Sequence, residues 1–184
     1  MPKIGQLFQN PATGERVEFL ETGRETGGKY VRFKATMPKG KGFEVAHFHP
    51  FGDETFEVLS GTLSIKLNGK TQKISKGQSI VLPKNQAHAH WNADEEELVV
   101  VQTISPCLDV DQFLENLFGL AMDGKLDKTG RPAFLQVMLW IRLLQNKTYL
   151  ATIPKWVQDA LSVLLFPPAR LLGYRAFYEK YTAR

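Results

Sequence analysis

The sequence has 184 residues, of which 43% are hydrophobic and 23% are charged. This is the composition of a globular chain that is long enough to bury its own core, and it excludes a disordered or fibrous protein. A single cysteine, Cys107, excludes an internal disulfide and is typical of a reducing compartment. No uncharged stretch exceeds eleven residues, and those of the last third, 132–141 and 160–169, have ten each, too few to span a bilayer.

The first ten residues contain no apolar core of signal-peptide length, and we therefore expect a cytoplasmic protein. The net charge of +4 is distributed unevenly. Residues 1–106 carry 13 basic and 12 acidic side chains, whereas residues 142–184 carry seven basic and two acidic ones. If the protein has an anionic partner, we expect it to bind the last third of the chain.

Up to about residue 105 the sequence is typical of short strands separated by turns. Alternating or β-branched runs predict strands at 16–22, 30–37, 55–59, 62–67, 78–82 and 97–104. Asn68-Gly69 predicts a hairpin with a type I′ turn, because that turn needs positive φ at both central residues. Many short strands with frequent turns predict an all-β barrel or sandwich.

Two histidines and a glutamate stand close together in this β-rich part. His47 and His49 are two residues apart, so in an extended strand both side chains point to the same face. Pro50 and Gly52 favour a bend, after which Glu54 can return to that face from the next strand. Because two imidazoles and a carboxylate suit a first-row divalent metal, the spacing predicts a metal site that needs a further ligand.

The two histidines of a later stretch, His88 and His90, are also two residues apart. Together the two stretches resemble the two motifs of the cupin superfamily. The first motif is a glycine, five residues, His-x-His, three or four residues, Glu, six residues and Gly. Here it reads His47-x-His49, four residues, Glu54, six residues and Gly61. The second motif is Gly, five residues, Pro-x-Gly, two residues, His, three residues and Asn. Here it reads Gly77, five residues, Pro83-x-Asn85, two residues, His88, three residues and Asn92.

The sequence departs from these motifs at two positions. The opening glycine of the first motif would fall on Lys41, although Gly40 and Gly42 flank it. The middle glycine of the second motif is replaced by Asn85, and asparagine is the residue that best tolerates a left-handed backbone after glycine. Neither departure touches a predicted ligand.

The resemblance covers about residues 30–105 and implies a mainly β fold, a double-stranded β-helix or jelly-roll barrel. It places the metal ligands on His47, His49, Glu54 and His88. This set suits one divalent transition metal, which can be iron, manganese, nickel, zinc or copper. The alternative is that the four residues are hydrogen-bonded and metal-free.

Other side chains are expected to line the same interior. His90 is in phase with His88, so it is either a catalytic general acid or base, or a histidine that is hydrogen-bonded at the rim. Glu57 is out of phase with Glu54 and should face solvent. The residues expected to line or floor the barrel are Phe43, Val45, Phe56 and Val58.

From residue 109 the apolar period changes from two to about 3.6, which predicts helices. We expect a first helix over 109–124, capped by Asp109 or Asp111, and a second over 133–145. A third over 154–166 should stop at Pro167-Pro168, and a fourth should run over 169–181. The chain is thus predicted to divide into a cupin β-barrel, 1–106, and a helical extension, 107–184.

The extension allows two interpretations. Its apolar stripes indicate helices packed on the barrel or on a dimer partner. Its aromatic and basic residues alternatively indicate peripheral contact of 142–184 with the inner membrane face, with an interfacial hairpin bent at Pro167-Pro168. Nucleic acid is not expected, because the basic residues form no patch.

Two functions remain open. The ligand set favours a metal-dependent enzyme, of oxygenase (dioxygenase-like oxidoreductase) or isomerase type, that acts on a small organic molecule. The alternative is a non-catalytic module that binds a small ligand or metal and contacts a partner or membrane through its helical tail. The resemblance also implies a homodimer.

Overall fold

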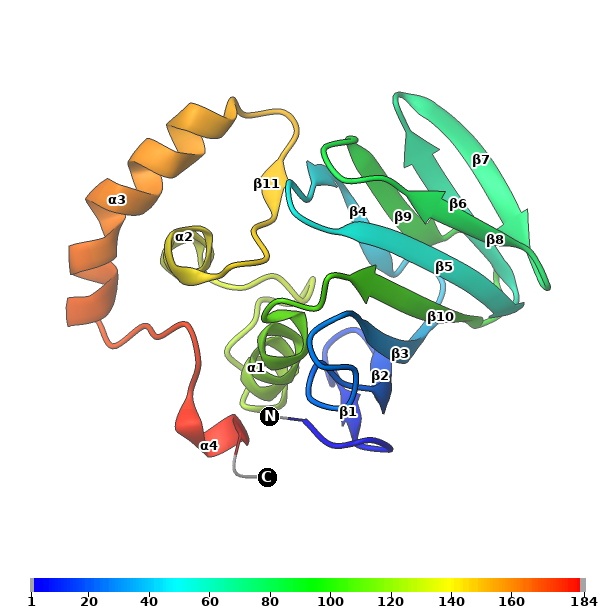
Figure 1. The fold of residues 1–184 in the computed structure, drawn as a ribbon, viewed down its shortest axis with the longest axis horizontal. Coiled ribbons are helices and arrows are strands. Elements are labelled where there is room, and N and C mark those ends of the chain that lie inside the picture. The colour runs from blue at the N-terminus through cyan, green and yellow to red at the C-terminus, as the bar shows by residue number, and fades with distance from the viewer. Residues whose placement is uncertain (1, 183–184) are drawn as a thin grey trace.

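A computed structural model of the protein describes residues 2–182. Two antiparallel sheets enclose the main core, and four helices lie to one side of them (Figure 1). The larger sheet has the order β1-β2-β3-β10-β5-β8 and the smaller has the order β11-β4-β9-β6-β7. The larger sheet comprises β1 (Leu7–Gln9), β2 (Arg16–Glu21), β3 (Val31–Met37), β10 (Leu98–Ser105), β5 (Asp53–Ser60) and β8 (Ser79–Leu82). The smaller comprises β11 (Tyr149–Leu150), β4 (Gly42–Phe48), β9 (His88–Asn92), β6 (Thr62–Leu67) and β7 (Lys70–Ser75). The predicted double-stranded β-helix with helices at its C-terminal side is confirmed.

The hairpin between β6 and β7 forms where the sequence predicted it. Asn68 and Gly69 have φ values of 50° and 81°, as a type I′ turn requires. Leu67 then pairs with Lys70, and the pairing continues to Thr62 and Ser75. A local two-residue signal therefore sets the register of the whole hairpin.

Strand β5 shows how the barrel divides its side chains between interior and solvent. Phe56 and Val58 are 0% and 2% exposed and pack in the core, as expected. Glu57 points the other way and forms a salt bridge of 3.1 Å with Arg32. On β4, Phe43 is 40% exposed and lies outside the core, although its ring lies 4.2 Å from the His47 ring. The β4–β9 register shifts between Phe43 and His47, so strict alternation does not extend across that segment.

The helices are α1 (Val110–Met122), α2 (Phe134–Leu143), α3 (Lys155–Leu171) and α4 (Glu179–Thr182). Asp109 occupies the position before α1, but its side chain does not cap that helix. Its carboxylate instead accepts hydrogen bonds from the backbone N–H groups of Gln145 and Asn146, at 2.7 and 2.9 Å. The predicted capping role was therefore wrong, because a more distant pair of donors takes this carboxylate.

The predicted stop of the third helix at its two prolines was also wrong, since α3 continues through Pro167 and Pro168 to Leu171. Prolines at these positions leave the carbonyls of Val163 and Leu164 without helical donors. Both residues lie on the exposed side, at 54% and 70% exposure, so water can bind these carbonyls. Proline therefore does not break α3, and the predicted hairpin bent at these prolines is not formed.

The fourth predicted helix, 169–181, is replaced by the end of α3, an irregular segment and the short α4. Gly173, with φ 86°, ends α3. The carbonyls of Arg175 and Ala176 then accept hydrogen bonds from the side chains of Gln136 and Trp140, each at 2.9 Å. These bonds hold the segment against α2 in an irregular conformation in place of the predicted helix.

The helices pack on the barrel and on one another. Val110 and Phe118 of α1 belong to the same buried cluster as the barrel residues Phe8 and Phe19. Helices α2 and α3 lie farther out, with α3 forming the edge of the molecule opposite the barrel (Figure 1). Within residues 2–182, every helix is too short or too polar to cross a bilayer.

Candidate metal centre

The four predicted ligands meet between the two sheets. His47 lies on β4 directly opposite His88 on β9, and His49 follows the end of β4. Glu54 comes from β5 of the facing sheet. One ligand atom from each residue lies within 4.8 Å of the other three. The structure thus brings together all four residues, and none of them is more than 9% exposed.

The backbone orients two of the histidine rings. His47 Nδ1 donates to the carbonyl of Val45 at 2.8 Å, and His88 Nδ1 donates to the carbonyl of Gln86 at 2.9 Å. Since a carbonyl only accepts, the proton of each neutral ring resides on Nδ1. Each Nε2 therefore carries a free lone pair, which is the tautomer that a metal-binding histidine needs.

Three buried atoms at the centre of the cluster have no hydrogen-bond partner, namely His49 Nε2, Glu54 Oε2 and His88 Nε2. Such atoms are costly inside a protein unless something satisfies them. His88 Nε2 lies 3.1 Å from Glu54 Oε2, and His49 Nε2 lies 3.5 Å from Glu54 Oε1. Two ligand atoms that each lie about 2.1 Å from the same ion, with a right angle between their bonds to it, are about 3 Å apart. The donor set and its spacing therefore fit a divalent cation and form a possible metal site.

Burial and mutual electrostatics set the protonation of these groups. Burial lowers the pKa of His47 to about 2 and also lowers the pKa of His49. Burial would raise the pKa of Glu54, but the surrounding histidines hold it well below its usual range. Burial likewise opposes protonation of His88, but the Glu54 carboxylate outweighs it and raises the pKa of His88. At neutral pH the site thus offers a carboxylate and, at His47 and His49, neutral imidazoles, the forms that bind metals. At His88 a cation would replace the proton that the Glu54 carboxylate favours.

A glutamine that the sequence analysis did not single out orients the carboxylate. Gln102 on β10 donates from Nε2 to Glu54 Oε1 at 2.9 Å, and both side chains are buried. This bond occupies one carboxylate oxygen and leaves Oε2 facing His88. No sequence signal could identify Gln102, because it lies 48 residues from Glu54 and outside both motifs.

The helical extension also reaches the cluster. Strand β11 pairs with β4, placing Tyr149 opposite Phe48 and Leu150 opposite His47. Just before β11, Thr148 Oγ1 lies 3.2 Å from His49 Nδ1. The Lys147 backbone beside it favours the protonated form of the same histidine, against the burial that lowers its pKa. The third ligand histidine is therefore oriented by a segment about one hundred residues away in sequence, which sequence reasoning missed.

His90 faces the same interior, as its phase predicted. It is 8% exposed, its ring centroid lies 6.1 Å from that of His47, and its Nδ1 has no partner. The Phe56 ring lies 4.8 Å from the His90 ring, and the Phe43 ring lies 4.2 Å from the His47 ring. Apolar rings therefore flank the cluster, and the partly exposed Phe43 stands between it and solvent.

Two departures from the expected motifs have clear structural reasons. Asn85 adopts a φ of 64°, and its N–H donates to the carbonyl of His49 at 2.8 Å. Gly42 lies so close to β9 that a Cβ atom would meet the carbonyl oxygen of His90 at 2.6 Å. Of the two glycines that flank Lys41, Gly42 is therefore the one that allows β4 to approach β9 closely, in place of the opening glycine of the motif. Asn92, fully buried, ties β9 to the carbonyls of Met37 and Glu96.

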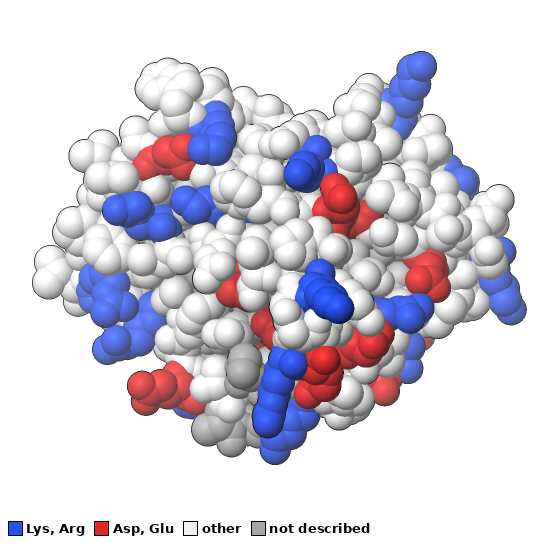
Figure 2. All heavy atoms as spheres, in the orientation of Figure 1, with Lys and Arg blue, Asp and Glu red and all other residues white. Residues whose placement is uncertain are grey.

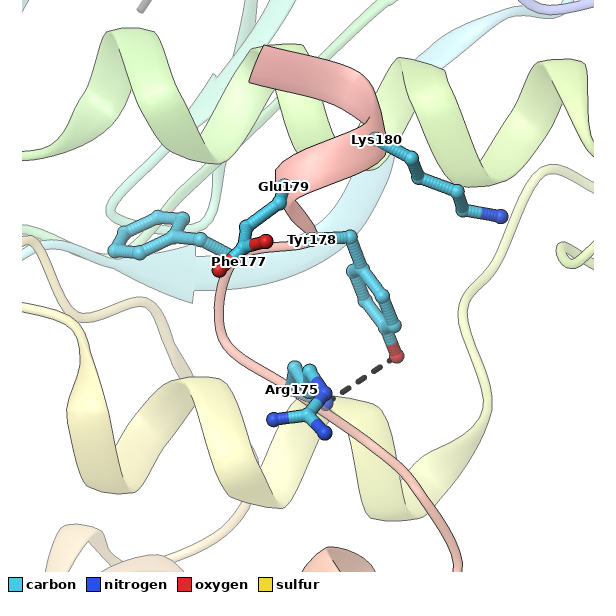
Figure 3. A pocket seen from close by; sticks show the side chains of 5 residues that line it. All are labelled: Arg175, Phe177, Tyr178, Glu179 and Lys180. Atoms are coloured by element: carbon cyan, nitrogen blue, oxygen red, sulfur yellow. Dashed lines mark hydrogen bonds between the residues drawn. The ribbon is translucent and has the colours of Figure 1, made fainter. Parts of the chain in front are cut away.

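A hollow beside the segment that leads into α4 shows no comparable convergence. The Phe177, Tyr178 and Lys180 side chains that line it diverge, and its other lining residues are Arg175 and Glu179 (Figure 3). The bond drawn there joins the Tyr178 hydroxyl to the backbone N–H of Arg175, at 3.3 Å. Cys107 is not a reactive thiol either, because burial raises its pKa to about 11.

Comparison with known proteins agrees with this geometry. Residues 33–104, which contain all four clustered residues, match the model of the cupin domain family. This segment is a cupin domain. The matched segment corresponds to the part of the chain, about residues 30–105, for which the motifs implied this fold.

Several curated proteins are similar to this cupin. A probable oxidoreductase of Hypocrea virens is 28% identical over 149 residues, which cover 73% of this chain and 66% of that protein. An oxidoreductase of Arthrobotrys oligospora is 26% identical over 209 residues, covering 99% of this chain and 81% of the relative. Quercetin 2,3-dioxygenase of Bacillus subtilis is 25% identical over 135 residues, covering 73% of this chain but 38% of the relative. The chain thus spans just under two thirds of the first of these proteins, and the match to the second includes the helical extension.

Proposed function

We propose that this cupin binds one divalent transition metal through His47, His49, Glu54 and His88 and oxidises a small organic substrate. The observation that carries the proposal is the convergence of four buried ligand atoms at the centre of the barrel, where His49 Nε2 has no hydrogen-bond partner and His88 Nε2 and Glu54 Oε2 face only each other. A cation would satisfy all of these atoms together. The oxidoreductase names of the relatives support the choice of an oxidation, although identities of 25–28% leave the substrate open.

The metal and the side chains around it would have separate roles in the reaction. A bound metal would supply Lewis acidity and, for the redox-active metals, the electron transfer that oxidation by O₂ needs. The four protein ligands leave positions open on a five- or six-coordinate ion, where small molecules can bind. Phe43 and Phe56 present apolar surfaces that exclude water and favour an apolar or aromatic substrate. His90 is a neutral imidazole at pH 7, because burial lowers its pKa to about 4, so it can accept a substrate hydrogen bond or proton.

Metal analysis and oxygen consumption test the proposal in sequence. Untagged protein is first assayed for bound metal, and metal-free protein is titrated with each candidate ion under anaerobic conditions. We expect close to one ion per chain. Fe(II)-loaded protein is then supplied with phenols, thiols and diketones in an oxygen electrode. Failure to take up any ion would refute the metal site itself.

The same assay separates the enzyme from a binding module. A specific observation favours the module: among the described residues, His90 is the one histidine of the interior left outside the ligand set, so proton transfer has few carriers. Metal uptake with tight ligand binding but no oxygen consumption over the whole panel would favour the module. Substrate-dependent oxygen consumption that is lost in His88→Ala would favour the oxidase.

A further inference from the structure

The outward side of α3 is apolar over its whole length. We define the α3 outer face as Trp156, Ala160, Val163, Leu164, Pro167 and Leu171. Apart from the adjacent Val163 and Leu164, these residues follow one another at helical spacings of three and four, so they share one side of the helix. Three of the large members, Trp156, Leu164 and Leu171, are 73%, 70% and 88% exposed. A continuous exposed face of this kind marks an interaction surface rather than scattered single residues.

This face cannot turn inward, because the opposite side of α3 is fixed. The Gln158 side chain is 2% exposed and bonds both the N–H and the carbonyl of Leu150, at 3.0 and 2.9 Å. Leu161 and Leu165 pack against the buried cluster that contains Met138 and Ile141. Rotating α3 to hide its outer face would break these contacts. The apolar residues are therefore held toward the outside of the molecule, where Figure 1 places α3.

The charges around this face are predominantly positive. Asp159, one of the two acidic residues after Arg142, is already paired with Lys155 at 2.6 Å. Among the described residues, the basic side chains of this region that form no salt bridge are Arg142, Lys147, Arg170 and Arg175. In Figure 2 the outer edge over α3 is uncharged, and basic atoms gather just inside it. The surface thus combines an apolar strip with a cationic border.

We propose that the α3 outer face docks on the surface of an anionic phospholipid bilayer, with the helix lying along the membrane plane. Apolar side chains would enter the boundary between headgroups and acyl chains, and Trp156 is suited to that interface. Arg170 and the neighbouring basic residues would meet lipid phosphates. A second copy of the chain fits less well, because an interface between two identical faces would bring these cations together with few free carboxylates to balance them.

Vesicle sedimentation of the full chain tests this docking. One set of vesicles contains phosphatidylcholine and phosphatidylserine, and the other contains phosphatidylcholine alone. We expect binding to the mixed vesicles at low salt, weaker binding at high salt, and little binding to the neutral ones. The double variant Leu164→Gln/Leu171→Gln should lower the partition coefficient by about ten-fold or more, because two exposed apolar anchors are lost. Arg170→Gln should lower it by about five-fold.

The matched control is Leu7→Gln, which changes a leucine of similar exposure, 61%, on strand β1 of the barrel. It should bind the mixed vesicles as the unchanged protein does. Equal binding to both kinds of vesicle, or no binding to either, would overturn the proposal. So would self-association of the chain that Leu164→Gln/Leu171→Gln abolishes in the absence of lipid, since a second copy would then cover the face.

Discussion

The histidines of the cluster differ in what surrounds their two ring nitrogens, and this predicts different consequences of removing them. His88 presents an unpartnered Nε2 to Glu54, whereas His90, two residues along the same strand, lies outside the group of four. Replacement of His88 by alanine removes one ligand. We expect it to weaken metal binding by more than about 100-fold, because the loss of an outer partner alone costs 10–100-fold. Competition with a chelating dye measures the affinity.

His90→Ala is the matched control for this experiment, since it removes a histidine of similar burial from β9. It should keep metal affinity within about three-fold, while any substrate turnover falls. If both variants lose the metal equally, His90 belongs to the ligand set and the assignment of four ligands is wrong.

Gln102 allows a second test at the residue scale, because it acts on the site only through Glu54. Gln102→Leu keeps side-chain bulk but leaves Glu54 Oε1 without its buried donor. The freed carboxylate can rotate, and we expect metal affinity to fall by about 10-fold to 100-fold. The visible spectrum of Co(II)-loaded protein should also change, since the carboxylate changes its coordination. Gln72→Leu, at an exposed glutamine on β7, should leave both unchanged.

The residues that sequence reasoning identified and those that it missed differ in the range of their interactions. His47, His49, Glu54 and His88 stand in two short motifs whose spacing follows from strand alternation and a tight turn. Gln102 and Thr148 contact the ligands across 48 and 99 residues. Their roles follow from strand pairing in three dimensions, which no local period encodes.

At the scale of single elements, β11 is the part of the extension that touches the metal centre. Thr148, immediately before it, contacts the Nδ1 of His49, the outer-partner position that the carbonyls of Val45 and Gln86 occupy for the other two histidines. Thr148→Val preserves shape but removes the hydroxyl. We expect metal affinity to fall by about ten-fold, the lower end of the outer-partner range, because Lys147 still contacts the ring. Dye competition measures this change.

Thr148→Ser should restore metal affinity to within about three-fold, because it returns the hydroxyl. Thr152→Val, which changes an exposed threonine a few residues farther on, serves as the matched control and should have no effect. A loss in Thr148→Val that serine does not rescue would mean that packing, rather than the hydrogen bond, holds His49.

The elements that were predicted well depend on local signals, and those that were predicted wrongly depend on distant contacts. Strand alternation and the Asn68-Gly69 turn are local, so β2, β3, β6 and β10 lie within about two residues of their predicted ranges. The course of α3 and the loss of the fourth predicted helix depend instead on the exposure of Val163 and Leu164 and on side chains of α2. A proline pair or a 3.6-residue period alone cannot reveal such partners.

At the scale of the whole molecule, the barrel and the extension share buried surfaces. Cys107, Val110 and Phe118 belong to the barrel core, and Tyr149 stacks on Phe48 of β4 with ring centroids 5.6 Å apart. Helix α3 is tied to β11 through Gln158. The division of the chain at residue 106 stays a prediction about sequence segments. The shared contacts indicate that the two segments unfold together.

Because the two segments are coupled, we predict a single unfolding transition. Bound metal should raise its midpoint for both segments together. A metal at about 100 times its dissociation constant adds about 2.7 kcal/mol to the free energy of unfolding, which raises Tm by about 5–10 °C for a chain of this size. Far-UV circular dichroism reports on both segments, and the fluorescence of Trp140 reports on α2. We expect the two signals to give the same unfolding midpoint. A variant with phenylalanine at Trp91 and Trp156 isolates the Trp140 signal, and His88→Ala serves as the control in which metal shifts neither midpoint. If Trp140 melted separately and only the barrel transition responded to metal, the extension would be an independent unit, and Thr148 could not hold His49 as the structure indicates.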